Sequence, residues 1–443
     1  MRVVDIIAKK KAGAALTEQE IRFVVTGFTQ GEIPDYQMSA LLMAICFCGM
    51  NRDEIFYLTD AMARSGRMAD LRAVGGITVD KHSTGGVGDK TTLIAGPIAA
   101  ACGVKIVKMS GRGLGFTGGT IDKLQAIPGF STDLPEHTVL ENVQKTNICV
   151  VSQSGDLVPA DKKIYALRDV TATVDSIPLI AASIMSKKIA SGCSCILLDV
   201  KTGSGAFMKT PQEALELART MVELGGQAHR PTMALITNMD RPLGCAVGNA
   251  LEVQEAVNTL RGAGPEDLLT LCVELAANMM VLARMGELKD CRAQAEAAVR
   301  SGAALAVFRQ MIALQGGDAR IADDPSLLGT AAHSCELLAP QDGFVSHIDT
   351  ALCGTAAMMT GAGRETKEAG IDCQAGLLLH KKPGEPVKQG ECVATLYAND
   401  QAKLAAAKEA LCSAYLYTSK PAHSQPLLYA RVSDAGTEWL HEE

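Results

Sequence analysis

The sequence contains few aromatic residues, no excess of positive charge and no long apolar run. Aromatic residues make up 4% of the 443 residues, whereas apolar residues make up 47% and glycine occurs 42 times. This composition is typical of an α/β protein with tightly packed helices, and the length predicts about two or three domains. The formal net charge of −7 argues against nucleic acid or an acidic membrane surface as the main partner.

The sequence also lacks the cysteine spacings of zinc sites and of redox dithiols. None of its 14 cysteines belongs to a Cys-x-x-Cys pair, and free thiols in a reducing compartment are the better interpretation. Charged residues interrupt the apolar N-terminus, so we expect neither a signal peptide nor a membrane span. Together these absences predict a cytoplasmic protein.

Residues 1 to about 65 predict helices. Thr17 with Glu20, and Asn51 with Glu54, have the spacing of a capping box. Residues 40–48 are almost wholly apolar, which is unusual for a solitary surface helix. We expect this segment to pack in a dimer interface, with an intramolecular core as the alternative.

From about residue 75, short β-branched runs alternate with helical stretches. The predicted strands are 77–80, 104–109, 148–152, 195–200 and 232–238. This alternation indicates a mostly parallel, doubly wound sheet, whose ligands bind beyond the carboxyl ends of the strands. After about residue 335, short alternating strands around glycine turns predict a β-rich hairpin subdomain.

Two loops rich in glycine and hydroxyl residues follow the first two predicted strands, at 81–92 and 110–122. Such loops present N–H and hydroxyl donors at helix N-termini, which suits phosphate. The side chains that would surround one phosphate are Lys81, Ser83, Thr92, Ser110 and Thr120. Glycine loops also serve simply as turns, but two of them at one edge of a sheet favour a binding site.

Neither loop fits a common nucleotide motif. Asp89 precedes Lys90 where a Walker A loop would approach the β-phosphate, and the G-x-G-x-x-G spacing is broken at Phe116. A P-loop NTPase and a dinucleotide site are therefore disfavoured.

Polar residues around these loops indicate a second ligand. His82 follows Lys81 and would protonate or orient a leaving group near neutral pH. In the helical insert, Ser183 and Lys187 lie four residues apart on one helix face and would address one planar ligand, together with Arg168. Structural roles, such as an ion pair of Arg168 with Asp169, are the alternative.

With these residues in view, the chain resembles the bacterial pyrimidine-nucleoside phosphorylases, relatives of thymidine phosphorylase. The resemblance covers essentially the whole chain and rests on the segments 79–89, 110–115, 117–124, 159–163, 165–174 and 183–188. It implies a homodimer formed through the N-terminal helices, and phosphorolysis of uridine, thymidine or deoxyuridine to the free base and a pentose 1-phosphate. It implies no organic cofactor, with phosphate as co-substrate.

The resemblance also implies a domain plan and residue roles. A helical domain would comprise 1–70 and the base-binding insert 160–192, an α/β domain 71–159 and 193–335, and an α+β subdomain 336–443. Phosphate would bind the five residues named above. The residues facing the base would be His82, Arg168, Ser183 and Lys187, with Tyr165 and Ile180 as apolar walls, and His82, Arg168 and Lys187 would act in catalysis.

The chain departs from the family pattern at two positions. Phe116 stands where the family usually has histidine, which leaves open phosphorolysis of another or a modified base. Lys90 stands where threonine is common, within a potassium site that the resemblance places at Gly88, Leu243, Ala246 and Glu255. We hypothesise that the Lys90 ammonium replaces the ion by pairing with Glu255.

Two further alternatives are disfavoured by the residues present. A non-catalytic nucleoside-binding protein would not need the intact set of Lys81, His82, Arg168 and Lys187. A related anthranilate phosphoribosyltransferase would use a pyrophosphate-bearing sugar and magnesium, and the long C-terminal region and the base-binding set argue against it.

Overall fold

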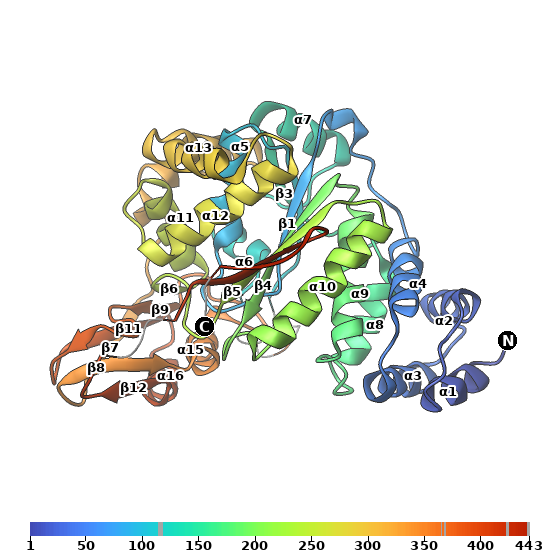
Figure 1. Ribbon diagram of the computed structural model, residues 1–443. Coiled ribbons are helices and arrows are strands. Elements are labelled where there is room, and N and C mark those ends of the chain that lie inside the picture. Colours follow the sequence, from blue (N-terminus) through green and yellow to red (C-terminus); the bar gives the residue numbers. More distant parts are fainter. Residues whose placement is uncertain (114–117, 365, 367–368, 422–424, 441–443) are drawn as a thin grey trace.

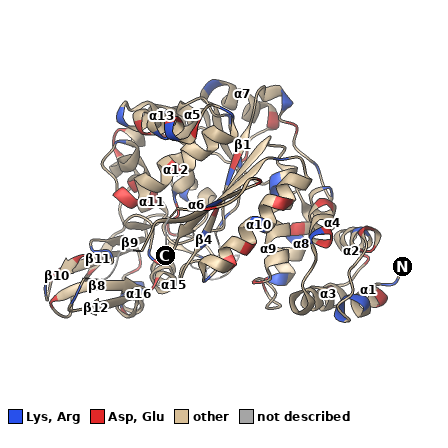
Figure 2. Cartoon of the chain, in the orientation of Figure 1, with Lys and Arg blue, Asp and Glu red and all other residues tan. Residues whose placement is uncertain are grey.

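The computed structural model describes residues 1–113, 118–364, 366, 369–421 and 425–440. Three parts lie in a row: a helical domain with the N-terminus, a central α/β domain and a C-terminal β-rich subdomain (Figure 1). Acidic and basic residues are interspersed over all three parts (Figure 2). The predicted fold class, a small helical domain joined to a larger α/β domain, is confirmed.

The helical domain is built from two separate stretches of the chain. Its helices share one apolar core and are α1 (Val3–Lys11), α2 (Glu18–Gln30), α3 (Asp35–Cys48), α4 (Arg52–Ala63), α8 (Pro159–Arg168) and α9 (Ile177–Ala190). Both predicted capping boxes are present, with Thr17 and Glu20 at the start of α2 and Asn51 and Glu54 at the start of α4. Each box satisfies otherwise unpaired N–H groups and so defines where its helix begins.

The central sheet is mostly parallel, and its five parallel strands correspond to the five predicted ones. In spatial order they are β3 (Ile148–Ser152), β2 (Ile106–Ser110), β1 (Val79–Ser83), β4 (Cys195–Thr202) and β5 (Thr232–Asn238). A parallel bridge between Thr78 and Lys105 joins β2 to β1. Every residue of β4 is buried, as expected for a strand covered by helices on both faces.

The first strand lies later in the chain than the predicted range of 77–80. Lys81, His82 and Ser83 pair with β4 and form the end of β1 rather than the start of a loop. Pairing with the buried neighbouring strand outweighs the weak strand propensity of these polar residues. As a result, their side chains project from a rigid element.

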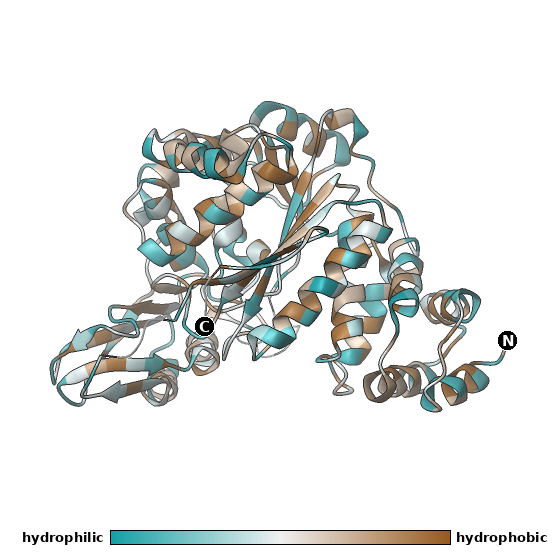
Figure 3. Cartoon of the chain, in the orientation of Figure 1, coloured by the Kyte–Doolittle hydropathy of each residue, from teal (hydrophilic) through white to brown (hydrophobic). Residues whose placement is uncertain are grey.

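Helices cover both faces of this sheet, and hydrophobic residues recur on them (Figure 3). On one side are α5 (Thr91–Ala101), α6 (Thr120–Gln125), α11 (Asn249–Leu260), α12 (Glu266–Leu282), α13 (Leu288–Arg300) and α14 (Ala303–Leu314). On the other side are α7 (Glu136–Thr146), α10 (Pro211–Gln227) and the helical-domain helices α4 and α9. The contact of α4 and α9 with this second core places the helical domain against the sheet.

In the part of the chain that the structure describes, no single helix has the length and apolar character that crossing a membrane requires. Helices α13 and α14 together have the length and composition of a membrane-crossing segment, but the two helices are bent by 69° relative to each other. These two helices pack against α12 and α5.

Among the described residues, the C-terminal subdomain contains two small antiparallel sheets, two α-helices and a short π-helix, Met358–Ala362. One sheet consists of β6 (Ala246–Gly248), β9 (Gly376–Leu379), β11 (Cys392–Ala398) and β7 (His333–Leu338). The other consists of β10 (Pro386–Val387), β8 (Gly343–Ile348) and β12 (Tyr415–Thr418), with α15 (Thr350–Ala357) and α16 (Gln401–Ala414) beside the sheets. Because β6 belongs to the α/β part of the chain, it ties the two regions together.

The end of the chain differs from the expected subdomain 336–443. β13 (Leu428–Ser433) pairs antiparallel with β5, and β14 (Gly436–Trp439) pairs with β13. Ala430 and Val432 are buried against the sheet. The last hairpin therefore belongs to the central sheet, where it covers the edge that β5 would otherwise leave unpaired.

Candidate active site

The predicted phosphate-binding residues gather where β1 and β2 end and α5 and α6 begin. Lys81 is buried, with its Nζ 2.5 Å from Thr91 Oγ1 and 3.2 Å from Asp199 Oδ2. The Ser83 hydroxyl donates to Asp89, whose other carboxylate oxygen accepts from Thr91 Oγ1 at 2.6 Å. Lys81 and Ser83 are therefore held in place by charged and hydroxyl neighbours before any ligand binds.

The other three predicted hydroxyl residues occupy element ends. Ser110 is the last residue of β2, Thr120 is the first residue of α6, and Thr92 lies in the first turn of α5. All three are half-buried, so that each still has a partly exposed surface. Their placement at a strand end and two helix N-termini is the arrangement that favours an anion.

Buried lysines surround this cradle, and most of them were not predicted. Lys188 Nζ lies 2.8 Å from Asp80 Oδ2, and Lys108 Nζ lies 3.8 Å from Asp80 Oδ1. Lys201 Nζ lies 2.8 Å from Asp199 Oδ2. Burial and the neighbouring Lys188 lower the pKa of Lys108 to about 7. The site is thus rich in lysines, and Asp80 and Asp199 lie close to them.

Lysines near the cradle also lower the pKa of His82. Its pKa lies well below the ordinary value because the ring is buried and because Lys188, Lys108, Lys187 and Lys81 all disfavour a further positive charge. The imidazole is therefore neutral at pH 7 in this structure. That state suits a hydrogen bond that orients the ligand, which is one of the two roles that the sequence suggested for His82.

The predicted base-binding residues come together between α8 and α9. Lys187 Nζ donates to Ser183 Oγ at 3.0 Å and to Asp161 Oδ2 at 2.6 Å. Lys187 Nζ lies 5.8 Å from the ring centroid of Tyr165, and Arg168 Cζ lies 5.7 Å from the same centroid. The structure thus brings an aromatic ring, a hydroxyl and two cations to one place, which suits a planar polar ligand.

One residue in this half of the site was not predicted. Asp161 orients Lys187. It lies four residues before Tyr165 on the same face of α8, and this spacing is the sequence feature that could have identified it. Ile180, which the resemblance implied as an apolar wall, is buried in α9, one helical turn before Ser183. It therefore lies on the face of α9 that carries the polar pair.

Arg168 has a structural task in addition to the predicted one. Its side chain is 1% exposed and donates to the carbonyl oxygens of Thr173, Val174 and Leu179 at 2.7–3.1 Å. Burial lowers its pKa from the ordinary value. A guanidinium has five N–H donors. Three of them bind the carbonyl oxygens of the segment between α8 and α9 and of α9 itself, so two remain for a ligand.

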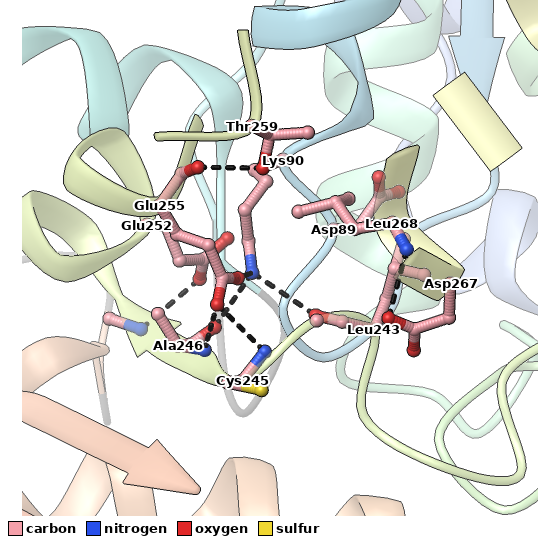
Figure 4. Close-up of polar contacts among 12 residues, drawn as sticks. Asp89, Lys90, Leu243, Cys245, Ala246, Glu252, Glu255, Thr259, Asp267 and Leu268 are labelled. Atoms are coloured by element: carbon pink, nitrogen blue, oxygen red, sulfur yellow. Dashed lines mark hydrogen bonds and ion pairs between the residues drawn. The ribbon is translucent and has the colours of Figure 1, made fainter. Parts of the chain in front are cut away.

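The residues implied for potassium surround the side chain of Lys90 instead (Figure 4). Lys90 Nζ donates to the carbonyl oxygens of Ala246 at 2.8 Å and Leu243 at 3.1 Å, and pairs with Glu255 at 2.5 Å. Gly88 lies against the Leu243 carbonyl. The predicted pairing of Lys90 with Glu255 is present. Phe116, the other departure from the family pattern, lies outside the described residues.

Comparisons with known proteins agree across nearly the whole chain. Residues 4–66 match the helical bundle domain of a glycosyl transferase family, and residues 75–305 match its a/b domain. Residues 344–418 match the C-terminal domain of pyrimidine nucleoside phosphorylases.

Individual proteins give the same result. The chain is 53% identical over 434 residues to the pyrimidine-nucleoside phosphorylase of Geobacillus stearothermophilus, covering 98% of this chain and 100% of that one. It is 55% identical over 400 residues to that of Bacillus subtilis (strain 168), covering 90% and 92%. A solved anthranilate phosphoribosyltransferase from Thermus thermophilus superposes with a TM-score of 0.58 over 70% of this chain and 98% of that one, at 19% identity, and so shares the fold.

Proposed function

The chain belongs to the pyrimidine-nucleoside phosphorylase family, and on that premise we propose that it is a pentosyltransferase that cleaves uridine, thymidine or deoxyuridine with inorganic phosphate. The products are the free base and ribose or deoxyribose 1-phosphate. The observation that carries the proposal is the pairing of a lysine-rich cradle on β1 and β2 with a polar aromatic set on α8 and α9. The lysine-rich cradle suits the negatively charged phosphate, and the polar aromatic set suits the planar, polar pyrimidine.

Phosphate is assigned to the cradle described above. Lys81 contributes charge, and the hydroxyls of Ser83, Thr92, Ser110 and Thr120 contribute hydrogen bonds. Phosphate is the co-substrate, and the residues need no organic cofactor for the reaction.

The base is assigned to Tyr165, Arg168, Ile180, Ser183 and Lys187. During reaction a phosphate oxygen forms a bond to the anomeric carbon while the bond from that carbon to the base nitrogen breaks. The bonding electrons pass to the base, whose negative charge is stabilised by Arg168 and Lys187, and by a hydrogen bond from neutral His82. The phosphate charge stabilises the electron-poor sugar, and a proton from solvent restores the neutral base.

We also propose that the protein is a homodimer formed through its N-terminal helices. α3 exposes Tyr36 and Phe47, which are 74% and 84% accessible, and the adjacent α1 exposes Val4. Phe47→Asp is expected to shift the sedimentation coefficient to that of a monomer. Leu416→Asp, a change at another exposed apolar residue on β12, is the control and should leave the dimer intact. A dimeric Phe47→Asp variant would place the interface elsewhere.

A cytoplasmic location is proposed from the thiols. All 14 cysteines are free, several of them buried, which suits a reducing compartment.

The direct test of function is phosphate-dependent release of base from a panel of nucleosides. We expect release from uridine, thymidine and deoxyuridine, no release without phosphate, and none from purine nucleosides. Absence of cleavage of every pyrimidine nucleoside would contradict the proposal, and cleavage confined to a modified base would redefine the substrate.

A further inference from the structure

The buried side chain of Lys90 lies at the centre of a cluster of oxygen atoms (Figure 4). Lys90 precedes the first residue of α5, and its side chain is 0% exposed. Its ammonium group contacts two carbonyl oxygens, from Leu243 and Ala246, and one carboxylate oxygen, from Glu255. Carbonyl and carboxylate oxygens are also the donors that hard metal cations prefer.

The ammonium group and its partners satisfy one another. A lysine has three N–H donors, and three acceptors lie within 3.1 Å of Lys90 Nζ. The second oxygen of Glu255 accepts the backbone N–H groups of Cys245 and Ala246 at 2.9 and 3.1 Å. The carboxylate is therefore fixed, and both members of the ion pair are fully hydrogen-bonded.

The charges of the cluster also balance. Next to Lys90 and Glu255, Lys123 Nζ lies 3.0 Å from Glu252 Oε2, so two ammonium groups face two carboxylates. Burial disfavours the charged form of Lys90, but Glu255 and Glu252 outweigh it and raise the pKa of Lys90. A metal cation added beside a charged Lys90 would be a buried charge without a counter-ion.

The backbone packs closely around the ion pair. A Cβ atom on Gly244 would lie 2.3 Å from Glu255 Oε2 and 3.1 Å from Lys90 Nζ. A Cβ atom on Gly88 would lie 2.5 Å from the Leu243 carbonyl oxygen. The potassium site that the family resemblance implies therefore does not fit this chain, because the ammonium group already holds the same oxygens.

We propose that Lys90 is a built-in monovalent cation, whose ammonium group permanently joins the first glycine loop to the 243–246 segment and to α11. The loop matters because Asp89, the neighbouring residue, holds Ser83 and Thr91 at the phosphate cradle. A dissociable ion stabilises a fold by an amount that increases with the logarithm of its concentration above the dissociation constant, whereas the stabilisation by a tethered cation does not depend on the salt added. Stability and turnover of the protein are therefore independent of added potassium.

The test replaces Lys90 with threonine or alanine. Thermal unfolding midpoints are measured in choline, sodium, potassium and ammonium chloride at one ionic strength, and uridine phosphorolysis is measured in the same salts. The unaltered protein should behave alike in potassium and choline. Lys90→Thr should unfold several degrees lower in choline and recover, in a saturable way, with potassium or ammonium, and its turnover should follow.

Lys105→Ala is the matched control. Lys105 Nζ also donates to two carbonyl oxygens, of Val74 and Gly75, each at 2.8 Å, and has no carboxylate partner among the described residues. Its replacement should change the midpoint equally in every salt. A cation effect specific to the Lys90 variants therefore reports the Lys90 cluster rather than general screening.

Two results would overturn the proposal. One is a potassium-dependent rise in the midpoint of the unaltered protein, a measurement that needs no variant to fold. The other is a folded Lys90→Thr variant that is insensitive to potassium and ammonium. The turnover measurement rests on the proposed function, but the unfolding midpoints do not, so a protein inactive on uridine would still decide the role of Lys90.

Discussion

Replacing Lys187 with methionine separates its proposed role in the reaction from its role in the fold. Methionine keeps most of the length of the side chain and removes the ammonium group. Asp161 is only 6% exposed, and its Oδ1 has no hydrogen-bond partner among the described residues. The substitution therefore also removes the cation 2.6 Å from Asp161 Oδ2 and leaves a buried carboxylate unpaired.

The structure sets the size of both effects. Removing one partner of a fully buried ion pair costs about 3–5 kcal/mol of unfolding free energy. Because Lys187 is 21% exposed and solvent screens the pair, we expect a smaller loss, about 2 kcal/mol. Loss of one group that stabilises charge on the departing base should lower kcat by about 10²- to 10³-fold.

The double variant Lys187→Met with Asp161→Asn distinguishes the two effects. Asparagine keeps the shape of Asp161 and removes its charge, so the unfolding free energy should return toward that of the unaltered protein while kcat stays low. Urea unfolding and initial rates of uridine phosphorolysis measure the two quantities. If kcat recovers together with stability in the double variant, Lys187 has only a structural role and the assignment fails.

Three further predictions concern other parts of the molecule. Arg168→Lys should lower the unfolding free energy by about 2 kcal/mol in urea, because an ammonium group cannot serve three carbonyl oxygens in the same plane; unchanged stability would contradict this. The apparent KM for phosphate should rise as pH increases through about 7, where Lys108 loses its proton. Lys108→Met should lack this rise. Because phosphate itself ionises equally in both assays, the difference between the two pH profiles reports Lys108 alone. Identical pH profiles would exclude Lys108. Asn51→Ala should cost about 1 kcal/mol through loss of the α4 cap, with kcat unchanged; a change in kcat would show coupling of that helix to the site.

Local sequence patterns were sufficient to predict those features that depend only on residues close together in the chain. The capping boxes that begin α2 and α4 are complete within four residues, and both were predicted. The parallel strands were predicted because buried strands in an α/β protein are short β-branched runs between helices. Once the strands were placed, their carboxyl ends located Lys81 and Ser110 without any knowledge of tertiary contacts.

Features that depend on distant segments were not predictable in the same way. Lys108, Lys188 and Lys201 come from three different elements, and only the folded sheet shows that they share Asp80 and Asp199. The return of residues 428–439 to the central sheet depends on the free edge of β5. The lowered pKa of His82 likewise follows from burial and from lysines, of which Lys188, Lys108 and Lys187 are remote in sequence.

Helix α9 connects the phosphate cradle to the proposed base-binding residues. Its consecutive residues Lys187 and Lys188 point in different directions, because neighbours on an α-helix are about 100° apart. Lys187 contacts Asp161 on the base side, whereas Lys188 Nζ contacts Asp80 at 2.8 Å under the phosphate cradle. Because the pair of Lys188 and Asp80 is almost wholly buried, breaking it would be costly.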